Sequence, residues 1–398
     1  MNTTQLGDLA DLRAGFGFPK MYQGRSLGEL PFAKVGDISR VGRSGSNVLT
    51  TAGHYIDEVD LTALKARAVP AGSTLFAKIG EAIRQEHRVM AGCSVVIDNN
   101  AMAAVPKPGV DPGYLFRFLQ TVNMYSMTAS TTVPALRKSD LELIPAPRRD
   151  IVQQRRIVSI LDKADELRTK RRQALAQLDV LAQSLFHNMF GNVSLNDRGW
   201  ESDTKLADVA EISSGITKGR RTNGQDLTTV PYMAVSNVQD MSLKLETVKY
   251  IDATPEEIDR LKLRKDDLLL TEGGDPDKLG RGTLWAEQLP LSIHQNHVFR
   301  VRVVREHVIH PLFLNWIVGS SRGKSYFLKS AKQTTGIASI NMTQLKAFPL
   351  LVPPFRLQEE FARRVAMIHR LRDRHSDQLA ELDALFASLQ HRAFSGQL

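Results

Sequence analysis

The sequence predicts two related α/β (α+β) domains in tandem, joined by two long helices that pack as an antiparallel coiled coil, with an internal pseudo-two-fold repeat. Three observations lead to this fold class. The chain has 398 residues, which is more than one ordinary hydrophobic core accommodates. Landmark runs recur about 200 positions apart, and two long helical patterns, free of Pro and Gly, end the two halves.

The repeat begins near the N-terminus, where LGDLADL starts at Leu6 and LADVAEI starts at Leu206. Further similar runs start at Leu30 and Val230, at His54 and Lys249, and at Leu141 and Leu345. The offset changes from 200 to 195 and then to 204 along these pairs, so insertions and deletions lie between shared landmarks. Such divergence is typical of surface loops that have changed separately on a common frame.

Each half opens with about 150 residues that read as short strands and helices, with β-rich runs at Cys93–Ile97 and Val298–Val304. A proline-containing segment follows, IPAPRRDIVQQ in the first half and FPLLVPPFRLQEE in the second. Proline ends the preceding element and is accepted at a helix start. We therefore expect long helices over about 151–190 and 356–394.

The two helical patterns repeat one another. QLDVLAQSLFHNMF from Gln177 and ELDALFASLQHRAF from Glu381 share seven of fourteen residues. Apolar residues alternate at spacings of four and three, which is the seam of a coiled coil. The predicted seam residues are Ile157, Leu161, Leu175, Leu178, Leu185, Phe361, Val365, Leu379, Leu382 and Leu389.

Polar residues interrupt both seams at matching places, Arg168 and Arg171 in the first and Arg372 and His375 in the second. An ordinary amphipathic helix packed on its own domain is the alternative. A helix of 40 residues would be about 60 Å long, which exceeds the width of a small domain and favours pairing of the two helices.

Composition indicates the kind of partner and compartment. A net charge of +9 and a pI near 9.6 favour a polyanion, most simply nucleic acid. Cys93 is the single cysteine and lies in an apolar run, so we expect a buried inert thiol and a reducing cytoplasm. No apolar run approaches the roughly 20 residues that cross a bilayer, and the N-terminal residues have no secretory pattern.

With these landmarks the sequence resembles the specificity subunit of type I restriction–modification systems, over essentially the whole chain. The resemblance rests on the pairs Leu6–Gly15 with Leu206–Gly215 and Pro145–Gln154 with Pro349–Gln358, and on QQRRIVSIL from Gln153. The second helix departs from the usual basic pair after Gln358, because Glu359 and Glu360 stand there. The implied segments are a first target-recognition domain (1–150), a central helix (151–191), a second target-recognition domain (192–353) and a C-terminal helix (354–398).

The resemblance implies a non-catalytic DNA reader. Such a subunit recruits two copies of an adenine methyltransferase (M) subunit and often two copies of a restriction and translocation (R) subunit. Each recognition domain reads one part of a split, asymmetric double-stranded DNA target, and the helices fix the gap. S-adenosylmethionine, and ATP with magnesium, are then expected on the partner subunits, with no cofactor on this chain.

The residues themselves offer no catalytic motif. A phosphate cradle of the form GxxxxGK[ST] is missing from the sequence. Amino-methylation needs a polar residue before Pro-Pro-aromatic, and Val352 provides none. His294 and His297 point to opposite faces of a strand, so we expect no metal pair. Glu272, Asp275 and Asp277 lack the spacing of a calcium loop and are read as a loop near DNA.

Arg, Lys, Asn and Gln in glycine-containing loops are the candidate DNA contacts, because phosphates and base edges are read by these side chains. The candidates are Arg40, Arg43, Lys78, Arg84, Arg88, Lys218, Arg220, Arg221, Asn223, Lys278, Arg281, Lys332 and Gln333. Contact with phosphates of the DNA spacer is one reading of the basic residues Arg155, Arg156, Arg171 and Arg172 of the central helix. We expect them instead to flank the coiled coil or to dock M subunits.

Two other functions fit parts of the pattern. One is a stand-alone methyltransferase or nuclease with its own recognition domain, against which the missing motifs argue. The other is a coiled-coil adaptor whose α/β domains bind proteins. Salt-dependent DNA binding separates the specificity subunit from the adaptor.

Overall fold

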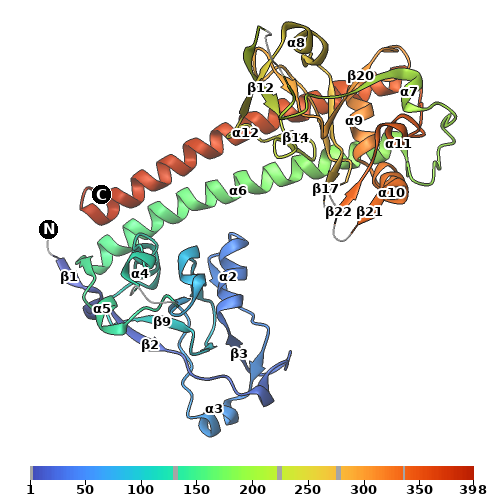
Figure 1. Cartoon of the computed structure of the whole chain (residues 1–398). Helices are drawn as coiled ribbons and strands as arrows, with labels where there is room; N and C mark the ends of the chain where they lie inside the picture. The colour runs from blue at the N-terminus through green and yellow to red at the C-terminus, as the bar shows by residue number, and fades with distance from the viewer. Residues whose placement is uncertain (1–2, 129–132, 222–225, 275–278, 335–336) are drawn as a thin grey trace. The chain divides into compact units, whose positions relative to one another are not determined.

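The structure, a computed structural model, describes residues 3–128, 133–221, 226–274, 279–334 and 337–398. The chain forms two compact units: unit 1 contains residues 1–175 and 374–398, and unit 2 contains residues 176–373. Each unit has a globular part of mixed helices and strands and a segment of each of two long helices, α6 (Ile151–Phe190) and α12 (Phe355–Ser395) (Figure 1). The two predicted helices are confirmed within one residue at each end.

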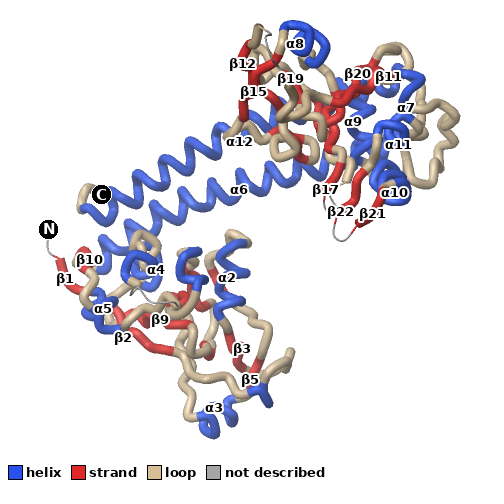
Figure 2. Tube along the Cα trace, viewed as in Figure 1, coloured by secondary structure: helices blue, strands red, loops and turns tan. Residues whose placement is uncertain are grey.

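The main sheet of unit 1 has five strands in the order β2-β9-β6-β7-β4. Figure 2 shows β2 and β9 of this sheet side by side. The strands are β2 (Ala10–Ala14), β9 (Ala101–Pro106), β6 (Thr74–Ala77), β7 (Arg88–Ala91) and β4 (Val48–Leu49). Both faces are covered, so alternate residues of β6 and β9 enter two different cores. Phe76 and Met102 pack with α4 (Pro112–Leu119), and Leu75 and Ala103 pack with α2 (Val35–Arg43).

A second, three-stranded sheet in unit 1 has the order β5-β3-β8. It contains β5 (Tyr55–Ile56), β3 (Leu30–Ala33) and β8 (Val96–Ile97), with β3 and β8 parallel. Its aromatic cover includes Phe18, whose ring stacks on Phe32 at 3.7 Å. The remaining elements of unit 1 outside α6 and α12 are β1 (Thr3–Gln5), α1 (Leu6–Leu9), η1 (Lys20–Tyr22), α3 (Glu58–Leu64), η2 (Glu81–Gln85), η3 (Tyr125–Met127), α5 (Lys138–Glu142) and β10 (Pro145–Pro147).

Unit 2 repeats this arrangement. Its main sheet has the order β11-β20-β16-β18, and its second sheet has the order β15-β12-β19, with β12 and β19 parallel. The strands are β11 (Ala210–Ser214), β20 (Val298–Val303), β16 (Leu268–Thr271), β18 (Gly282–Leu284), β15 (Lys249–Ala253), β12 (Thr228–Met233) and β19 (Ile293–His294). The landmark runs of the sequence therefore fold into equivalent elements.

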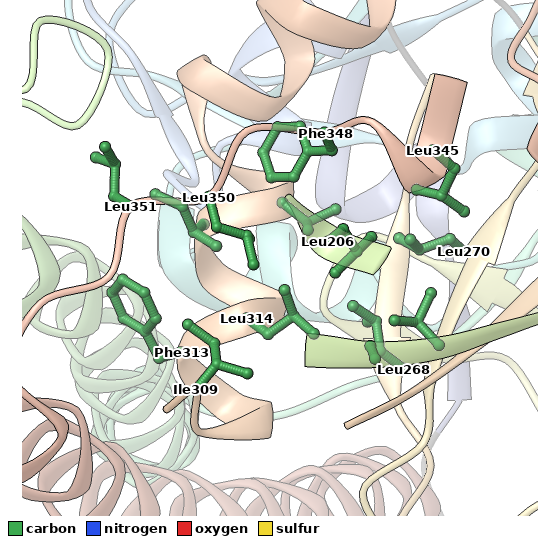
Figure 3. Packing of buried hydrophobic residues seen from close by; sticks show 14 of the residues in the cluster. Leu206, Leu268, Leu270, Ile309, Phe313, Leu314, Leu345, Phe348, Leu350 and Leu351 are labelled. Atoms are coloured by element: carbon green, nitrogen blue, oxygen red, sulfur yellow. The ribbon is translucent and has the colours of Figure 1, made fainter. Parts of the chain in front are cut away.

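The other elements of unit 2 are short, apart from its segments of α6 and α12. They are α7 (Leu206–Val209), β13 (Val238–Gln239), β14 (Ser242–Leu243), α8 (Pro255–Leu261), β17 (Gly273–Gly274), α9 (Pro311–Gly319), α10 (Ser321–Ser330), β21 (Lys332–Thr334), β22 (Ile337–Ser339) and α11 (Met342–Lys346). Leu206, Leu268 and Leu314 meet in its core, and Phe348 and Leu350 close that core from the segment after α11 (Figure 3).

The landmark glycines are explained by close backbone contacts. A Cβ atom on Gly15 would lie 2.0 Å from the carbonyl oxygen of Asp98, and one on Gly215 would lie 1.9 Å from the carbonyl oxygen of His294. In both units the next residue then pairs in parallel with the segment after β8 or β19. Only glycine fits at these two positions, because any Cβ would collide with backbone.

The landmark glutamines are explained by hydrogen bonds. The side chain of Gln154, buried near the start of α6, accepts from the backbone N–H of Asp111 at 2.7 Å and donates to the carbonyls of Gly109 and Arg149. Gln358 does the same near the start of α12, accepting from the N–H of His310 at 2.8 Å. Each buried amide is satisfied and ties a long helix to the loop before α4 or α9.

Cys93 is half-exposed rather than buried, and its Sγ lies 3.7 Å from the carbonyl oxygen of Thr50. The expectation of a buried thiol was wrong because β8 begins only at Val96, after the turn that carries Cys93. The described ranges contain no helix that could span a membrane, since none is at once sufficiently long and sufficiently apolar.

Candidate nucleic-acid interface

The first-half candidates differ in exposure. Arg40, Arg43 and Arg84 are exposed, Lys78 is half-buried and Arg88 is buried. Arg40 donates to Asp37 and to the carbonyl of Thr51, both at 3.3 Å. The exposed cations therefore come from the end of α2 and from η2.

Arg84 in η2 is an exposed cation with several side-chain partners. Its guanidinium lies 4.5 Å from the ring centroid of Tyr125 and donates to the Tyr125 hydroxyl at 2.5 Å. Its Nε also donates to Glu81 at 3.2 Å. Tyr125 is held in turn by Glu86, which accepts from its backbone N–H at 2.8 Å. An arginine supported by an aromatic ring is an arrangement suited to phosphate contact or base stacking.

The structure corrects the prediction that Arg88 contacts DNA. It is 5% exposed, at the start of β7, and donates to the carbonyls of Glu86 and Val122. Burial lowers the pKa of its guanidinium, and the neighbouring Glu86 carboxylate partly offsets this effect. Arg88 therefore satisfies two backbone carbonyls in the protein interior and offers no exposed surface to DNA.

Arg43 ends α2 and lines a cavity of about 390 Å³ that also contains Arg117, Asp165, Arg168 and Arg172. The pKa of the nearby His87 is lowered, first by burial and then by the positive charges of Arg43 and Arg88. Arg43 and Arg88 therefore both place positive charge close to His87.

In the second half, Lys218 and Arg221 are exposed, whereas Arg220 is half-buried. The ammonium of Lys218 lies 5.2 Å from the ring centroid of Tyr232. Arg220 donates twice to Glu257, each time at 2.5 Å, and this hydrogen bonding raises the pKa of Arg220. Both side chains of this pair are only 20% exposed, unlike those of the exposed pair of Arg84 with Glu81. A guanidinium held twice by a shielded carboxylate is a poorer phosphate ligand, so Lys218 and Arg221 are the stronger members of this loop.

The remaining candidates are less defined. Arg281 is half-buried and donates to Gln239 at 3.0 Å. Lys332 and Gln333 lie in β21, which pairs with β22 in a sheet ordered β17-β22-β21, and their side chains lie outside the described part of the chain. Asn223 and Lys278 lie outside the described residues altogether.

The two histidines lie in different surroundings. His294 is buried, its Nδ1 lies 2.7 Å from the carbonyl oxygen of Val298, and burial lowers its pKa to about 4. His297 is exposed and its Nδ1 lies 2.6 Å from the carboxylate of Glu272. Asp275 and Asp277 lie outside the described residues. In the described ranges, no three His, Cys, Asp or Glu residues are grouped closely enough to hold a metal ion.

Within each unit, α6 packs against α12. All ten seam residues are buried or half-buried. In unit 1, Ile157 and Leu161 share a core with Tyr114 of α4 and with Phe386 of α12. In unit 2, Phe361 and Val365 share a core with Phe186 and the globular part. The helices therefore contact both each other and their own globular part, which combines the two alternatives weighed from the sequence.

Ion pairs link the two helices where the seam is polar. Arg168 lies 2.5 Å from Asp383 in unit 1, and Arg372 lies 3.3 Å from Asp179 in unit 2. Arg171 hydrogen-bonds His375 in unit 1. In both units, residues further along α6 contact residues earlier in α12, so the helix segments pack antiparallel.

A charged cluster in unit 1 was not predicted from the sequence: the buried Arg117 of α4 donates to the exposed Asp162 and the half-buried Asp165 of α6. A signal was present, because Arg117 is the single charged residue in the apolar run YLFRFL. A charge among buried apolar residues predicts a buried partner. Tyr125, which supports Arg84, had no comparable signal.

Sequence comparison identifies relatives of one kind. No family model matches the chain. The chain is 23% identical over 313 residues to the specificity subunit of the type I restriction enzyme StySPI of Salmonella potsdam, a match that covers 74% of this chain and 67% of that protein. It is 21% identical over 291 residues to the EcoKI specificity subunit of Escherichia coli strain K12, covering 69% of this chain and 62% of that protein.

Solved structures share the fold. The type I S subunit from M. genitalium aligns over 99% of this chain and 96% of its own length, with a TM-score of 0.55 and 13% identity. A chain from work on complex assembly and conformational transition of a type I system aligns over 100% and 98%, with a TM-score of 0.58 and 16% identity. The resemblance to type I specificity subunits is therefore confirmed.

Proposed function

We propose that this chain is the DNA sequence-specificity subunit of a type I restriction–modification complex and has no catalytic activity of its own. One observation carries the proposal: a duplicated frame presents unlike surfaces. Gly15 and Gly215, and Gln154 and Gln358, make the same contacts in the two units. The loops after the two glycines differ, since Phe18 stands three residues after Gly15 and the exposed Lys218 stands three residues after Gly215.

A duplicated frame with different loops suits a bipartite, asymmetric target. Each target-recognition domain would read one half of that target, with 1–150 and 192–353 as their limits. The net charge of +9 supports binding to the phosphate backbone, and exposed loop residues would read base edges. A pseudo-two-fold arrangement of the domains through an antiparallel coiled coil would present them to two half-sites at a fixed separation.

Methyltransferase subunits are the proposed protein partners. On the helix pair of unit 1, Leu167 and Leu385 are exposed and line a groove of about 540 Å³. Their equivalents 204 positions away, Leu371 and Leu181, are exposed in unit 2. Two matched pairs of exposed leucines support two copies of one M subunit, and the R subunits would join the same complex.

The chemistry would then reside on these partners. S-adenosylmethionine would bind the M subunits, and ATP with magnesium would bind the R subunits. This chain would supply the sequence, the spacing and the docking surfaces.

The test is methyl transfer to DNA by the purified chain, alone and with a co-expressed adenine methyltransferase subunit. The proposal expects no transfer by the chain alone, transfer by the complex at a split motif, and salt-dependent DNA binding by the chain. Transfer by the chain alone would establish the stand-alone enzyme. Protein binding without DNA binding would establish the adaptor.

A further inference from the structure

Beside the apolar core and the Gln154 hydrogen bonds, a buried arginine joins the globular part of unit 1 to its helices. Arg117 of α4 is 5% exposed. Its Nε and one terminal nitrogen donate to Asp162 at 3.0 and 2.7 Å, and both terminal nitrogens donate to Asp165 at 3.0 Å. The two carboxylates lie one turn apart on α6. A single guanidinium therefore clamps two positions of the helix.

Asp165 is the centre of this joint. One of its oxygens accepts from Arg117 and also from the side-chain amide of Asn47 at 2.9 Å. The other oxygen accepts from Arg168 at 2.9 Å. Asn47 lies between α2 and β4, so one carboxylate connects α4, the loop after α2 and α6. All of these partners must be in place together for the carboxylate to be satisfied.

Helix α12 completes the same joint. The ring of Phe386 lies 5.6 Å from the guanidinium of Arg117 and 4.2 Å from that of Arg168. The side-chain amide of Gln390 donates to the carbonyl of Arg117 at 3.5 Å. Arg117 of the globular part therefore contacts both long helices.

Unit 2 uses different chemistry at the same place. Pro112 and Pro311 both begin their helices, and the residue five positions later is Arg117 in α4 and Trp316 in α9. Trp316 packs on Phe186 of α6 and Phe361 of α12, with ring centroids 5.3 and 5.4 Å apart. The joint of unit 1 is charged and directional, whereas the joint of unit 2 is aromatic.

We propose that Arg117 is a positioning residue that fixes the globular part of unit 1 on its helices and thereby governs recognition of one half of the DNA target. The inference rests on the proposed function. Apolar contact alone permits small rotations, but a bidentate fork across two carboxylates defines one orientation. A mutation far from the chemistry that misplaces the reacting groups by about 1 Å can cost about 100-fold in rate.

The test uses the complex of the full chain with its methyltransferase subunit. Methylation rates are measured on three duplexes: the cognate target, a target altered in one half and a target altered in the other half. Arg117→Met keeps the length of the side chain and removes the charge. We expect it to lower discrimination against one altered half by about tenfold or more and to leave discrimination at the other half unchanged.

Matched variants make the result specific. Arg117→Lys restores an ion pair without the fork, so it should recover part of the lost discrimination. Trp316→Leu should affect the opposite half only. Asp162→Asn, which removes one of the two carboxylates from a partly exposed position, replaces Arg117→Met if that variant does not fold.

Two outcomes would overturn the inference. One is that Arg117→Met, or Asp162→Asn in its place, retains both discrimination ratios. The other is that it lowers both ratios equally, as a general loss of stability would. If the unsubstituted complex shows no sequence preference at all, the proposed function fails instead.

Discussion

Arg168 on α6 and Asp383 on α12 form an ion pair at 2.5 Å, and the positions 204 residues away from each of them form one as well. Arg372 is the repeat equivalent of Arg168, Asp179 is the equivalent of Asp383, and these two lie 3.3 Å apart. Arg171 pairs with His375, its own equivalent. Exchange of partners between equivalent positions is the signature of a surface that packs against its own copy.

The central pair also explains why the copies differ. Identical sequences would bring two arginines together at this point. Histidine in place of the second arginine removes one obligatory charge and provides a ring nitrogen that accepts from Arg171. Divergence of the two helices thus stabilises the contact between them.

The first prediction concerns Arg84 and Arg88, which are four residues apart and differ in burial. Arg84→Gln should weaken DNA binding and reduce the slope of log affinity against log salt by about 1, because one phosphate contact is lost. Arg88→Gln should leave that slope unchanged and destabilise the fold by about 1–3 kcal/mol, because the carbonyls of Glu86 and Val122 lose their donor. Salt titrations and denaturant unfolding of both variants provide the measurement, and equal slopes for Arg84→Gln and the unsubstituted chain would refute the DNA contact.

Much of the architecture was predictable from sequence because it depends on local patterns. The long helices follow from an apolar ladder without Pro or Gly, and the repeat follows from the landmark runs at Leu6 and Leu206. It was less predictable which of the candidate arginines and lysines are exposed and could contact DNA, because burial of a side chain depends on partners distant in sequence. Arg88 lies 34 positions from Val122 and Arg220 lies 37 positions from Glu257, and no local signal connects them.

The second prediction concerns the exposed leucines of the helix pair. Leu167→Glu with Leu385→Glu should remove one methyltransferase copy, and Leu181→Glu with Leu371→Glu should remove the other. A charge on a buried apolar contact typically eliminates a binding hot spot. The stoichiometry of each complex is measured by mass, with an expected change from two M subunits to one.

Val152→Glu is the matched control, because Val152 is also an exposed apolar residue of α6 and lies outside both leucine sets. If both double leucine variants retain two M subunits, as the control does, the leucines are not the docking surface.

The third prediction concerns Gly15. Gly15→Ala should destabilise the chain by ~1–3 kcal/mol, because the added Cβ would meet the backbone of Asp98 at 2.0 Å. Gly17→Ala is the control two residues away, since nothing lies within 4 Å of a Cβ there. Denaturant unfolding should show a change for Gly17→Ala of less than about 0.5 kcal/mol. Equal stability of the two variants would count against the tight backbone contact.

The fourth prediction concerns pH and His294. Burial lowers its pKa to about 4 in the folded chain, whereas the unfolded value is near 6.5. Below pH 6.5 the unfolded chain therefore binds a proton that the folded chain does not, so stability falls as the pH drops from 6.5 to 4. This group should account for a loss of roughly 2 kcal/mol between pH 7 and pH 5.

The measurement is the unfolding free energy of the unsubstituted chain and of His294→Asn across this pH range. The difference between them should narrow toward acid pH, because the variant lacks the titrating group. His297→Asn is the exposed control and should keep the acid-dependent loss. A difference that stays constant with pH would show that His294 does not contribute.

The most direct test of a two-part DNA reader is sequencing of methylated adenines in cells that express this chain with its methyltransferase subunit. We predict a split motif with a fixed gap, of which one half changes and the other persists when residues 1–150 are exchanged for those of a relative. A continuous motif, or a motif in which both halves change together after that exchange, would contradict it.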